Sequence, residues 1–506
     1  MTRNFFTRLI QKSKPPLYER CFGLILALIA LCSASISLSI GLMQSVWFDE
    51  AYSIFLAKQT IGELLRLTSL DTHPPLYYLL LHVWGNVFGW SEIALRSLSV
   101  LAMGGATFVA GLFVKRWFGA RTAIIAVLFV ATAPFLLRYG FEIRMYSIAS
   151  LIGIAATYVL TIALTSTGKK QRWLFAVYAV LVALSMYTLY YMAFLWIAHV
   201  VWLFLYGKTK TSKTSLYRQQ WILALTFSVV LFLPWLPTFI SQLTNGALAP
   251  ISQAMTLENM VGIISFNFAY QPVWQLGPWI SLLIAAVLVI LPLIIKRAYA
   301  GLNKQQRPYY TLLLLYFSVP ILLVIVISLL RPLYVERYLS QITIGGMLLV
   351  GVSVAITTLR KDKAWQLTGL FLLAVQLYGV AHLGEVGNYN FQRLEKPSVA
   401  KIVEKAGPCD DRSVILANDP YVAIELSYYF TNCQVKFYSQ TDELRGGYAP
   451  LSNSQNRFEN PEQQLKGVQT INYIHYGQPE LRMPSNFTQV GQDTIGALTV
   501  ARFSAE

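Results

Sequence analysis

The stretch FGLILALIALCSASISLSIGLMQSVWFDEAYS, residues 22–53, joins a long apolar run to an acidic pair. Residues 22–42 can cross a bilayer, since a spanning helix needs about 20 predominantly apolar residues. The run lacks a small-residue cleavage site and further runs follow, so we expect a retained anchor rather than a removed signal peptide. Asp49 and Glu50 lie just beyond it, and carboxylates that close to hydrocarbon are costly unless they are solvated or functional.

Comparable apolar runs recur along the first three quarters of the chain. Of its 506 residues, 55% are hydrophobic and 13% are charged, whereas soluble domains carry about 25% charged residues. We therefore expect an α-helical polytopic membrane protein. The eleven predicted spans are residues 22–42, 93–114, 122–137, 145–166, 173–188, 191–206, 221–240, 276–295, 309–330, 338–358 and 364–383. The third, fifth and sixth are slightly short, so their boundaries are soft.

The segment PPLYYLLLHVWGNVFG, residues 75–90, is apolar but too short for a clear span. Its polar and small residues repeat at helical spacing and fall on one face. Such a helix suits the membrane surface better than the bilayer centre. We therefore expect residues 75–90 to lie in the interface, within the first outer loop.

The distribution of Lys and Arg tests this choice. With 75–90 in the interface, the loops on one side, including the N-terminal segment, carry 22 Lys and Arg, and the loops on the other carry 6. The positive side faces the cytoplasm. Counting 75–90 as a span would move Lys115, Arg116 and Arg121 to the other side and break the pattern. We expect insertion in the inner (plasma) membrane, with a cytoplasmic N-terminus and an extracytoplasmic C-terminal region.

From about residue 384 the composition is that of a soluble domain. The predicted division is a transmembrane domain, 1–383, and a small C-terminal extracytoplasmic α/β domain, 384–506. Residues 398–407 read as a helix and residues 413–419 as a strand that ends in a turn; VKFYS, INYIHY and LTVARFS read as further strands. Cys409 and Cys433 lie in this region and could form a disulfide in an oxidising compartment.

Two polar motifs follow the acidic pair on the same side of the membrane. In SLDTHPPLYY, Asp71 and His73 precede the interfacial helix, where Asp71 would also serve as a helix cap. In LRYGFEIRMYSI, Arg138, Glu142 and Arg144 lie at the outer ends of adjacent spans. The donor fork of arginine suits a phosphate, although an Arg–Glu pair could equally fix the turn, with the arginine reaching toward the interface.

A late outer loop and a long outer loop add to this set. SLLRPLYVERYLSQ carries Arg331, Glu336 and Arg337, and two arginines outside run against the positive-inside bias unless an anionic head group compensates them. Loop 241–275 has no Lys or Arg and one acid, Glu258. It is rich in Gln, Asn and aromatic residues, a composition that suits contact with sugar or lipid.

Several of these motifs together resemble a known family. WFDEAYS, THPPLYYLLLHVWGNVFG followed by ALRSLSVL, KRWFGAR and YGFEIRMYSI are similar in order and spacing to the protein O-mannosyltransferase-like membrane glycosyltransferases, family 39 and its bacterial relatives, of the GT-C fold. The resemblance covers residues 45–165, and RPLYVERYL looks like the family's late outer-loop motif. His-Pro-Pro is followed by Leu-Tyr-Tyr rather than the Leu-Gly-Lys of eukaryotic members, which points to the bacterial branch and leaves a protein acceptor in doubt.

The resemblance implies transfer of a sugar from a polyprenyl-phosphate donor to a hydroxyl of a lipid, glycan or protein, with inversion, at the extracytoplasmic face. Asp49 would be the base and Arg144 would hold the donor phosphate. Some relatives bind a divalent metal and others do not, so the resemblance leaves the metal open; Asp49, Glu50 or Asp71 would be the ligands if one binds. The candidate residues are Asp49 and Glu50 for catalysis, and Asp71, His73, Arg138, Glu142, Arg144, Arg331 and Arg337 for substrate binding.

Other classes of function fit less well. The net charge of +16 does not indicate nucleic-acid binding, because most Lys and Arg lie in short loops and no basic patch with interleaved aromatic residues occurs. A polyprenyl-lipid flippase or transporter remains the alternative, although transporters place their sites at the membrane midplane, whereas the acids here gather at one face. A structural membrane protein would leave the clustered acids and arginines unexplained.

Overall fold

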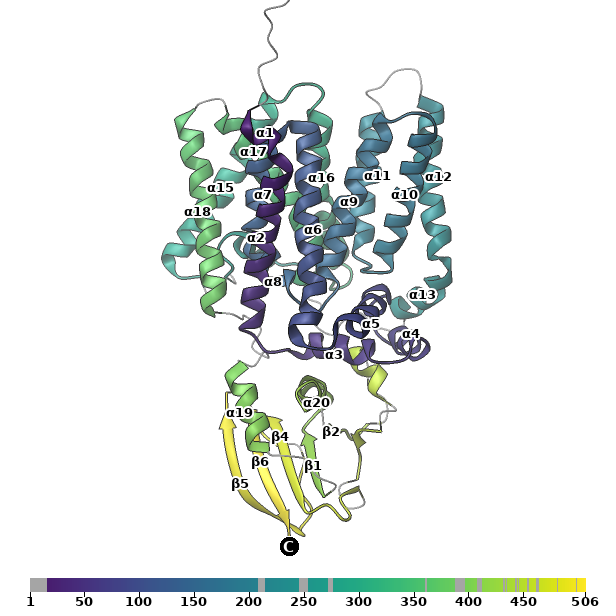
Figure 1. Ribbon diagram of the computed structural model, residues 1–506, viewed down its shortest axis with the longest axis vertical. Coiled ribbons are helices and arrows are strands. Elements are labelled where there is room, and N and C mark those ends of the chain that lie inside the picture. The colour runs from purple at the N-terminus through teal and green to yellow at the C-terminus, as the bar shows by residue number, and fades with distance from the viewer. Residues whose placement is uncertain are drawn as a thin grey trace, which may run out of the picture.

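A computed structural model gives the fold of the chain. It describes residues 16–207, 214–244, 254–271, 276–359, 362–386, 396–406, 412–430, 433, 435–441, 444, 446–452, 455–460, 464–479, 481–496 and 498–506. A helical bundle fills one end of the molecule and a small sheet domain the other (Figure 1).

The bundle helices run along the long axis of the molecule (Figure 1). They are α1 (Leu17–Arg20), α2 (Phe22–Leu42), α6 (Glu92–Phe118), α7 (Ala120–Ala131), α8 (Pro134–Gly140), α9 (Tyr146–Thr165), α10 (Gly168–Met186), α11 (Met192–Gly207), α12 (Thr214–Phe232), α15 (Pro278–Gly301), α16 (Arg307–Ser328), α17 (Ser340–Thr358) and α18 (Lys363–Val386). Shorter connecting helices are η2 (Leu233–Trp235), α13 (Leu236–Thr244), α14 (Leu257–Phe268) and η4 (Glu336–Leu339).

Each of the eleven predicted spans coincides with helix. Within the described residues, eight helices are long and apolar enough to cross a membrane, or nine if α7 and α8, bent by 64° at their junction, form one broken span. The other two predicted spans are α10, which has Lys169, Lys170 and Arg172 near its start, and α11, which is only 16 residues long. These are the segments whose sequences are short or interrupted.

The helix α17 lies at the centre of the bundle. In the stretch from Glu336 to Thr358, 94% of the most apolar window is buried, as expected for a helix that is apolar on every face. A side-chain carbon at Gly351 would lie 2.5 Å from the Cα of Ala126 in α7, so glycine is required for this close approach. Packing on all sides fixes α17, and with it the loop and η4 that precede it.

Three short helices lie across one end of the bundle (Figure 1): α3 (Phe48–Ala57), α4 (Ile61–Leu70) and α5 (Leu76–Phe88). The α5 helix begins after Pro75 and ends at Gly89, whose φ of 91° stops it. At 13 residues and about 1.5 Å per residue it is shorter than the roughly 30 Å hydrocarbon core. The short length of α5 and its position across the end of the bundle (Figure 1) agree with an interfacial helix, and its placement at the membrane surface stays a prediction.

The C-terminal domain is a mixed six-stranded sheet in the order β3-β2-β1-β4-β6-β5, with β6 and β5 antiparallel to their neighbours. Its elements are α19 (Lys396–Ala406), β1 (Ser413–Ala417), α20 (Pro420–Ser427), β2 (Val435–Tyr438), η5 (Gly446–Leu451), β3 (Arg457–Phe458), β4 (Thr470–Tyr476), β5 (Phe487–Ile495) and β6 (Leu498–Ala505). The predicted helix and four predicted strands are found, whereas β3, β5 and α20 were not foreseen. The boundary between residues 383 and 384 stays a prediction.

The cysteines agree with an oxidised C-terminal region. Cys433 is disulfide-bonded, while Cys21 and Cys32 are free. Cys409, the predicted partner of Cys433, lies outside the described residues, so the pairing stays a prediction.

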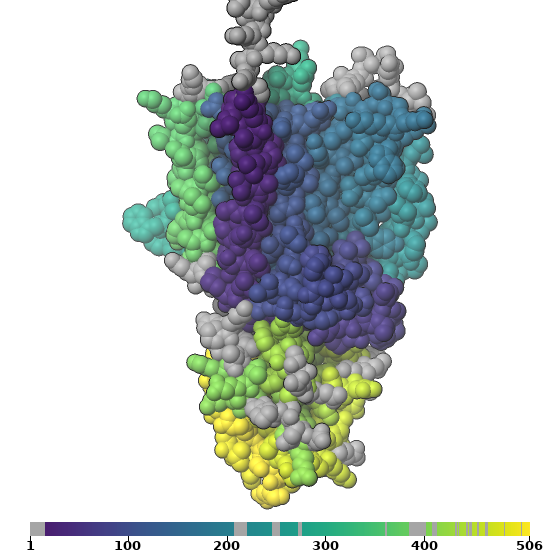
Figure 2. Space-filling model, viewed as in Figure 1, coloured from purple at the N-terminus to yellow at the C-terminus, as the bar shows by residue number. Residues whose placement is uncertain are grey.

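The sheet domain packs against the helices at the end of the bundle. In Figure 2 the α3–α5 segment forms a layer between the bundle and this domain. Phe48 of α3 stacks on Tyr421 of α20 with ring centroids 4.4 Å apart and contacts Tyr448 at 5.4 Å. The hydroxyl of Tyr429 accepts a hydrogen bond from the backbone N–H of Val46. The turn that carries Asp49 is thus held between two parts of the protein.

Candidate active site

The two acids of the first outer loop occupy the first turn of α3. Successive residues of a helix are about 100° apart around its axis, so the side chains of Asp49 and Glu50 leave α3 in different directions. Glu50 is fully buried, and its carboxylate accepts a hydrogen bond of 3.4 Å from the backbone N–H of Trp47, which caps the helix. The Asp49 side chain keeps 13% of its surface exposed. The two acids therefore meet different surroundings.

Glu50 belongs to a buried group of charges that we call the Arg96 clamp: Arg96, Glu50 and Glu92. The Arg96 guanidinium, at 0% exposure, donates to both oxygens of Glu50, at 3.2 Å to Oε1 and 2.9 Å to Oε2. It also pairs with Glu92, and the backbone N–H of Ile143 donates to Glu50 Oε1 at 3.1 Å. The remaining acceptors of Arg96 are the carbonyls of Gly41, Gln44 and Ser45. The clamp ties the end of α2 to α3, α6 and the loop before α9.

Asp49 belongs to a second group, the Asp49 cluster: Asp49, His73, Tyr78, Arg144 and Arg337. Asp49 Oδ2 lies 3.3 Å from Nη2 of Arg337 and 3.9 Å from Nε of Arg144. The two arginines come from segments almost 200 residues apart in sequence. The structure therefore brings the predicted base beside two of the predicted phosphate-binding arginines.

Arg144 connects most of the Asp49 cluster. Its Nη1 donates to the Ser53 hydroxyl and to the Tyr78 hydroxyl, both at 3.3 Å. Its Nη2 lies 3.4 Å from Nε2 of His73. The Arg144 side chain is 3% exposed, and a desolvated cation of this kind acts strongly on any anion that reaches it.

Asp71 was predicted to cap the interfacial helix, but it contacts two members of the Asp49 cluster, Tyr78 and His73, instead. The structure shows no side-chain cap on α5; instead the Tyr78 hydroxyl donates to Asp71 Oδ2 at 3.3 Å, and His73 Nδ1 lies 3.5 Å from the same oxygen. His73 Nε2 faces the Arg144 donor and, at 2.9 Å, the Tyr338 hydroxyl. Because guanidinium only donates, Nε2 is the acceptor and Nδ1 carries the proton. Burial lowers the pKa of His73, against the effect of Asp71.

Several buried donors around Asp49 have no hydrogen-bond partner among the described residues. They are Arg144 Nε, Arg337 Nε and the hydroxyls of Tyr52 and Tyr146. Burial raises the pKa of Tyr52 well above its usual range, so its hydroxyl keeps its proton. Buried donors in native proteins are nearly always paired. Four of them around one carboxylate suit an anionic ligand.

The remaining predicted residues lie apart from Asp49. Arg138 Nη1 donates to Glu142 Oε1 at 2.7 Å, and both side chains are at most 3% exposed. The sequence left open whether these residues bind phosphate or fix the turn. The structure shows the Arg–Glu pair, in which Nη1 of Arg138 is bonded to Glu142. Arg331 is exposed and, among the described residues, donates a hydrogen bond to the carbonyl of Leu243 at 3.4 Å, at the end of α13.

Arg96 and the tyrosines were not among the predicted residues. Arg96 lies inside the predicted span 93–114, and a charged residue within an apolar span is a signal for a buried partner; that signal could have found it. Tyr52, Tyr78 and Tyr338 gave no such signal, because tyrosines are common at membrane interfaces.

The donor set fits a divalent metal poorly. Among the described residues, no group of three or more His, Cys, Asp or Glu side chains is arranged to hold a metal ion. Both oxygens of Glu50 are taken by Arg96, and Asp49 already has two guanidinium groups within 4 Å. Positive charge here is supplied by the chain itself, and metal dependence stays a prediction.

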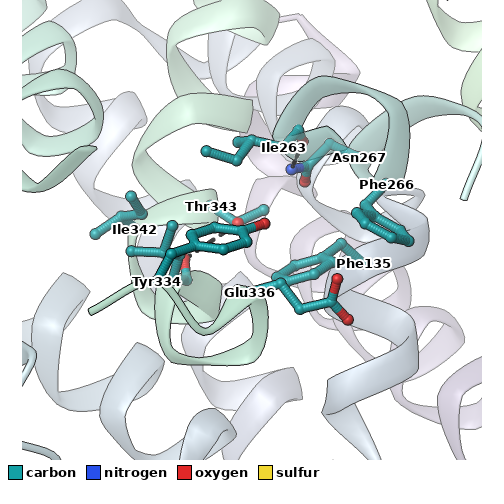
Figure 3. A pocket seen from close by; sticks show the side chains of 9 residues that line it. Phe135, Ile263, Phe266, Asn267, Tyr334, Glu336, Ile342 and Thr343 are labelled. Atoms are coloured by element: carbon teal, nitrogen blue, oxygen red, sulfur yellow. Dashed lines mark hydrogen bonds between the residues drawn. The ribbon is translucent and has the colours of Figure 1, made fainter. Parts of the chain in front are cut away.

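A pocket is lined in part by Glu336, the sequence neighbour of Arg337. It encloses about 260 Å³ of space, part of which is open to solvent. Figure 3 shows the side chains that line it. They are Phe135, Ile263, Phe266, Asn267, Tyr334, Glu336, Leu339, Ile342 and Thr343.

Residues 72–237, about a third of the chain, match the model of the dolichyl-phosphate-mannose-protein mannosyltransferase family. This segment includes His73 and Arg144 but neither Asp49 nor Arg337. The comparison with curated proteins gives no match.

Two crystal structures of ArnT from Cupriavidus metallidurans share the fold. The one bound to undecaprenyl phosphate is 13% identical with a TM-score of 0.63, over 96% of this chain and 98% of that chain. The one in the apo state is 12% identical with a TM-score of 0.61, over 94% and 97%. The likeness therefore includes the bundle and the C-terminal domain. The family match and the shared fold together identify the chain as a membrane glycosyltransferase of the GT-C fold, similar over residues 72–237 to the dolichyl-phosphate-mannose-protein mannosyltransferases.

Proposed function

We propose that the protein transfers one sugar from a polyprenyl-phosphate carrier to a hydroxyl acceptor, with inversion at the anomeric carbon. The observation that carries this proposal is the position of Asp49 between two guanidinium groups, 3.3 Å from the partly buried Arg337 and 3.9 Å from the buried Arg144. Undecaprenyl phosphate, the ligand of one ArnT structure, is a lipid of the proposed class. The acceptor is a lipid, a glycan or a protein.

The proposed roles follow from the chemistry of the bond that breaks. Asp49 takes the proton of the acceptor hydroxyl, whose oxygen attacks the anomeric carbon from the side opposite the phosphate. The bond between that carbon and the phosphate oxygen breaks, and both electrons leave with the phosphate. Arg144 and Arg337, with unpartnered buried Nε–H groups, stabilise the developing charge.

The other predicted residues have positioning roles in this proposal. Glu50 has both oxygens bound by Arg96, so we assign it the positioning of α3 rather than proton transfer. His73 and Asp71 hold Arg144 and Tyr78 in place through the contacts described above. The Arg138–Glu142 pair fixes the turn before Arg144.

We also propose that the site faces the outside of the cell. The Asp49 cluster and the C-terminal domain lie at the same end of the bundle (Figure 1), and the loops at that end are poor in Lys and Arg, 6 against 22. In this orientation the N-terminus is cytoplasmic. Residues 1–383 form the membrane domain and residues 384–506 the extracytoplasmic domain.

The alternative, a flippase or transporter of polyprenyl lipids, is less well supported. A transporter site lies near the membrane midplane and is reached from both sides in turn. Here α3 and α5, which carry Asp49 and Tyr78, lie at the end of the bundle that meets the C-terminal domain (Figure 1). A glycosyltransferase takes its lipid donor from one leaflet, so a site that is reached from one side of the membrane is sufficient for it.

The test is sugar transfer by the purified full-length protein in liposomes. Labelled polyprenyl-phosphate sugars are offered with an envelope extract as acceptor, to the wild type and to Asp49→Asn. The proposal expects labelled product from the wild type, and a rate about 10²- to 10⁴-fold lower from Asp49→Asn, the usual contribution of a general base.

Correct folding of Asp49→Asn is checked by its elution profile and thermal unfolding. Full activity of a folded Asp49→Asn protein would remove the assignment of the base. Faster movement of labelled lipid across the bilayer, without any transfer, would favour the flippase.

A further inference from the structure

The pocket lined in part by Glu336 combines aromatic rings with a few polar groups. Phe135 comes from α8, and Phe266 and Asn267 come from α14, in the loop whose composition suggested sugar or lipid contact. Glu336 lies at the start of η4, directly before Arg337. Figure 3 shows the Glu336 carboxylate beside the rings of Phe135 and Phe266.

The polar groups of this pocket are mainly hydrogen-bond acceptors. Glu336 receives one hydrogen bond, from the Tyr139 hydroxyl to Oε1 at 3.0 Å, and a carboxylate can accept more. Asn267 is 2% exposed, and its Nδ2 donates to the carbonyl of Ile263 at 2.7 Å. That bond fixes the amide orientation, and Oδ1 has no hydrogen-bond partner among the described residues.

We propose that this pocket holds the sugar of the polyprenyl-phosphate donor and selects it by its hydroxyl groups; the proposal rests on the donor class proposed above. Sugar hydroxyls donate hydrogen bonds to Glu336 and to Asn267 Oδ1, and the C–H face of the ring packs on Phe135 or Phe266. Arg337, next to Glu336 in sequence, directs the phosphate toward Asp49. The two contacts come from consecutive residues of η4, whose side chains leave this 3₁₀ turn in different directions.

The prenyl chain is the other part of the donor that a pocket in this region could take. It carries no hydrogen-bond donor, so it would leave the Glu336 carboxylate and the amide oxygen of Asn267 desolvated and unpaired, which is costly. The acceptors of the pocket therefore favour a ligand that brings hydroxyl donors over a prenyl chain, which has none.

The experiment separates the sugar from the rest of the lipid. Binding to the full-length protein in detergent is measured for undecaprenyl phosphate and for its mannose, glucose and galactose esters. The variants are Glu336→Gln and Asn267→Leu, which keep side-chain size and remove acceptors. The matched control is Glu258→Gln, the same change at an exposed acid of α14 outside the pocket.

The wild type should bind one sugar ester more tightly than undecaprenyl phosphate alone. Each pocket variant should weaken that ester about tenfold, as expected for the loss of a charge-assisted or buried hydrogen bond, and should bind undecaprenyl phosphate as the wild type does. Equal weakening of the ester and the bare lipid would overturn the proposal in favour of the prenyl chain. It is equally overturned if the wild type shows no preference for any ester, or if the variants keep the preference.

The same assay keeps the two proposals apart. Arg337→Ala reports on phosphate binding, because it should weaken undecaprenyl phosphate with or without a sugar. Loss of binding in Arg337→Ala with no effect of the pocket variants would leave the proposed function intact and remove only the sugar pocket.

Discussion

The Arg96 clamp and the Asp49 cluster lie side by side and are built from neighbouring residues, yet they differ in how completely their groups are paired. In the clamp, Glu50 and Arg96 are both at 0% exposure, and Arg96 donates to two acids and three carbonyls. In the cluster, the Asp49 side chain is 13% exposed, and buried donors of Arg144 and Arg337 have no partner among the described residues.

This difference in pairing indicates that the Arg96 clamp stabilises the fold and that the Asp49 cluster binds a ligand, although their acids lie in the same helical turn. A set of charges that satisfy one another gains nothing from a ligand, and removing one leaves its partner buried and unpaired. A set with spare donors is costly in isolation and is satisfied when an anion arrives. Substitutions in the clamp should therefore affect stability, and substitutions in the cluster should affect catalysis and binding.

The largest loss of stability is expected for Glu50→Gln. The variant leaves the buried Arg96 guanidinium beside a neutral amide, with Glu92 as its remaining acid, and keeps only one of the two oxygens that accept from Arg96 and from the backbone N–H of Ile143. Breaking a buried ion pair on one side costs about 3–5 kcal/mol. Thermal unfolding in detergent measures the effect as a lower Tm.

Asp49→Asn is the matched control for that measurement, because it makes the same chemical change one residue earlier. Its Tm should fall by less than that of Glu50→Gln, because the Asp49 side chain is 13% exposed and Arg144 keeps its other hydrogen bonds, while transfer is lost. Equal losses of Tm in the two variants would mean that the clamp and the cluster do not differ in this way.

A smaller effect, mainly on the affinity for the polyprenyl-phosphate lipid, is expected for Arg337→Ala. The Arg337 side chain is 18% exposed and pairs with Asp49 alone among the acids within 4 Å in the described residues, so its removal should lower Tm by less than Glu50→Gln does. A hydrogen bond to a charged group is worth about 1.5–3 kcal/mol, which is roughly a 10- to 150-fold loss of affinity for undecaprenyl phosphate. Lipid binding measures it, and an unchanged affinity would exclude Arg337 from the phosphate site.

His73 should give the cluster a modest dependence on pH. Burial lowers its pKa in the folded state below the usual 6.5, so the unfolded chain binds more protons below pH 6.5. Stability is then full above pH 6.5 and falls as the pH drops toward the folded pKa. In a series of Tm measurements from pH 8 to pH 5, His73→Gln should lose less Tm on acidification than the wild type; an identical slope would show that His73 does not carry the effect.

The sequence was most informative where one physical constraint dominates. Long apolar runs have no stable alternative to helices in a bilayer, and the shortness of 75–90 was enough to place α5 across the end of the bundle. Strand β5 was missed because most of its residues are exposed or partly exposed, so it lacks the alternation that marks a half-buried strand. Strand β3 is two residues long and carries no pattern at all.

For the candidate site, the sequence supplied the residues but not their grouping. Asp49 and Glu50 look alike as a pair of acids, and only the turn of α3 sends one toward Arg337 and the other toward Arg96. Arg331 and Arg337 share one short loop, and no local signal tells which of them points inward. Both distinctions depend on contacts between segments far apart in the chain, which composition and spacing do not record.

The smallest effect is expected for Arg331→Ala, the counterpart of Arg337→Ala in the same loop. Arg331 is exposed, and its hydrogen bond to the carbonyl of Leu243 is 3.4 Å long. Exposed substitutions of this kind usually change stability by less than about 0.5 kcal/mol, so transfer and lipid affinity should stay within about twofold of the wild type. The two arginines then differ by at least fivefold in the same lipid-binding assay. If Arg331→Ala weakens the binding of undecaprenyl phosphate as strongly as Arg337→Ala does, both arginines of the loop hold the phosphate. The position of Arg337 beside Asp49 would then not explain phosphate binding.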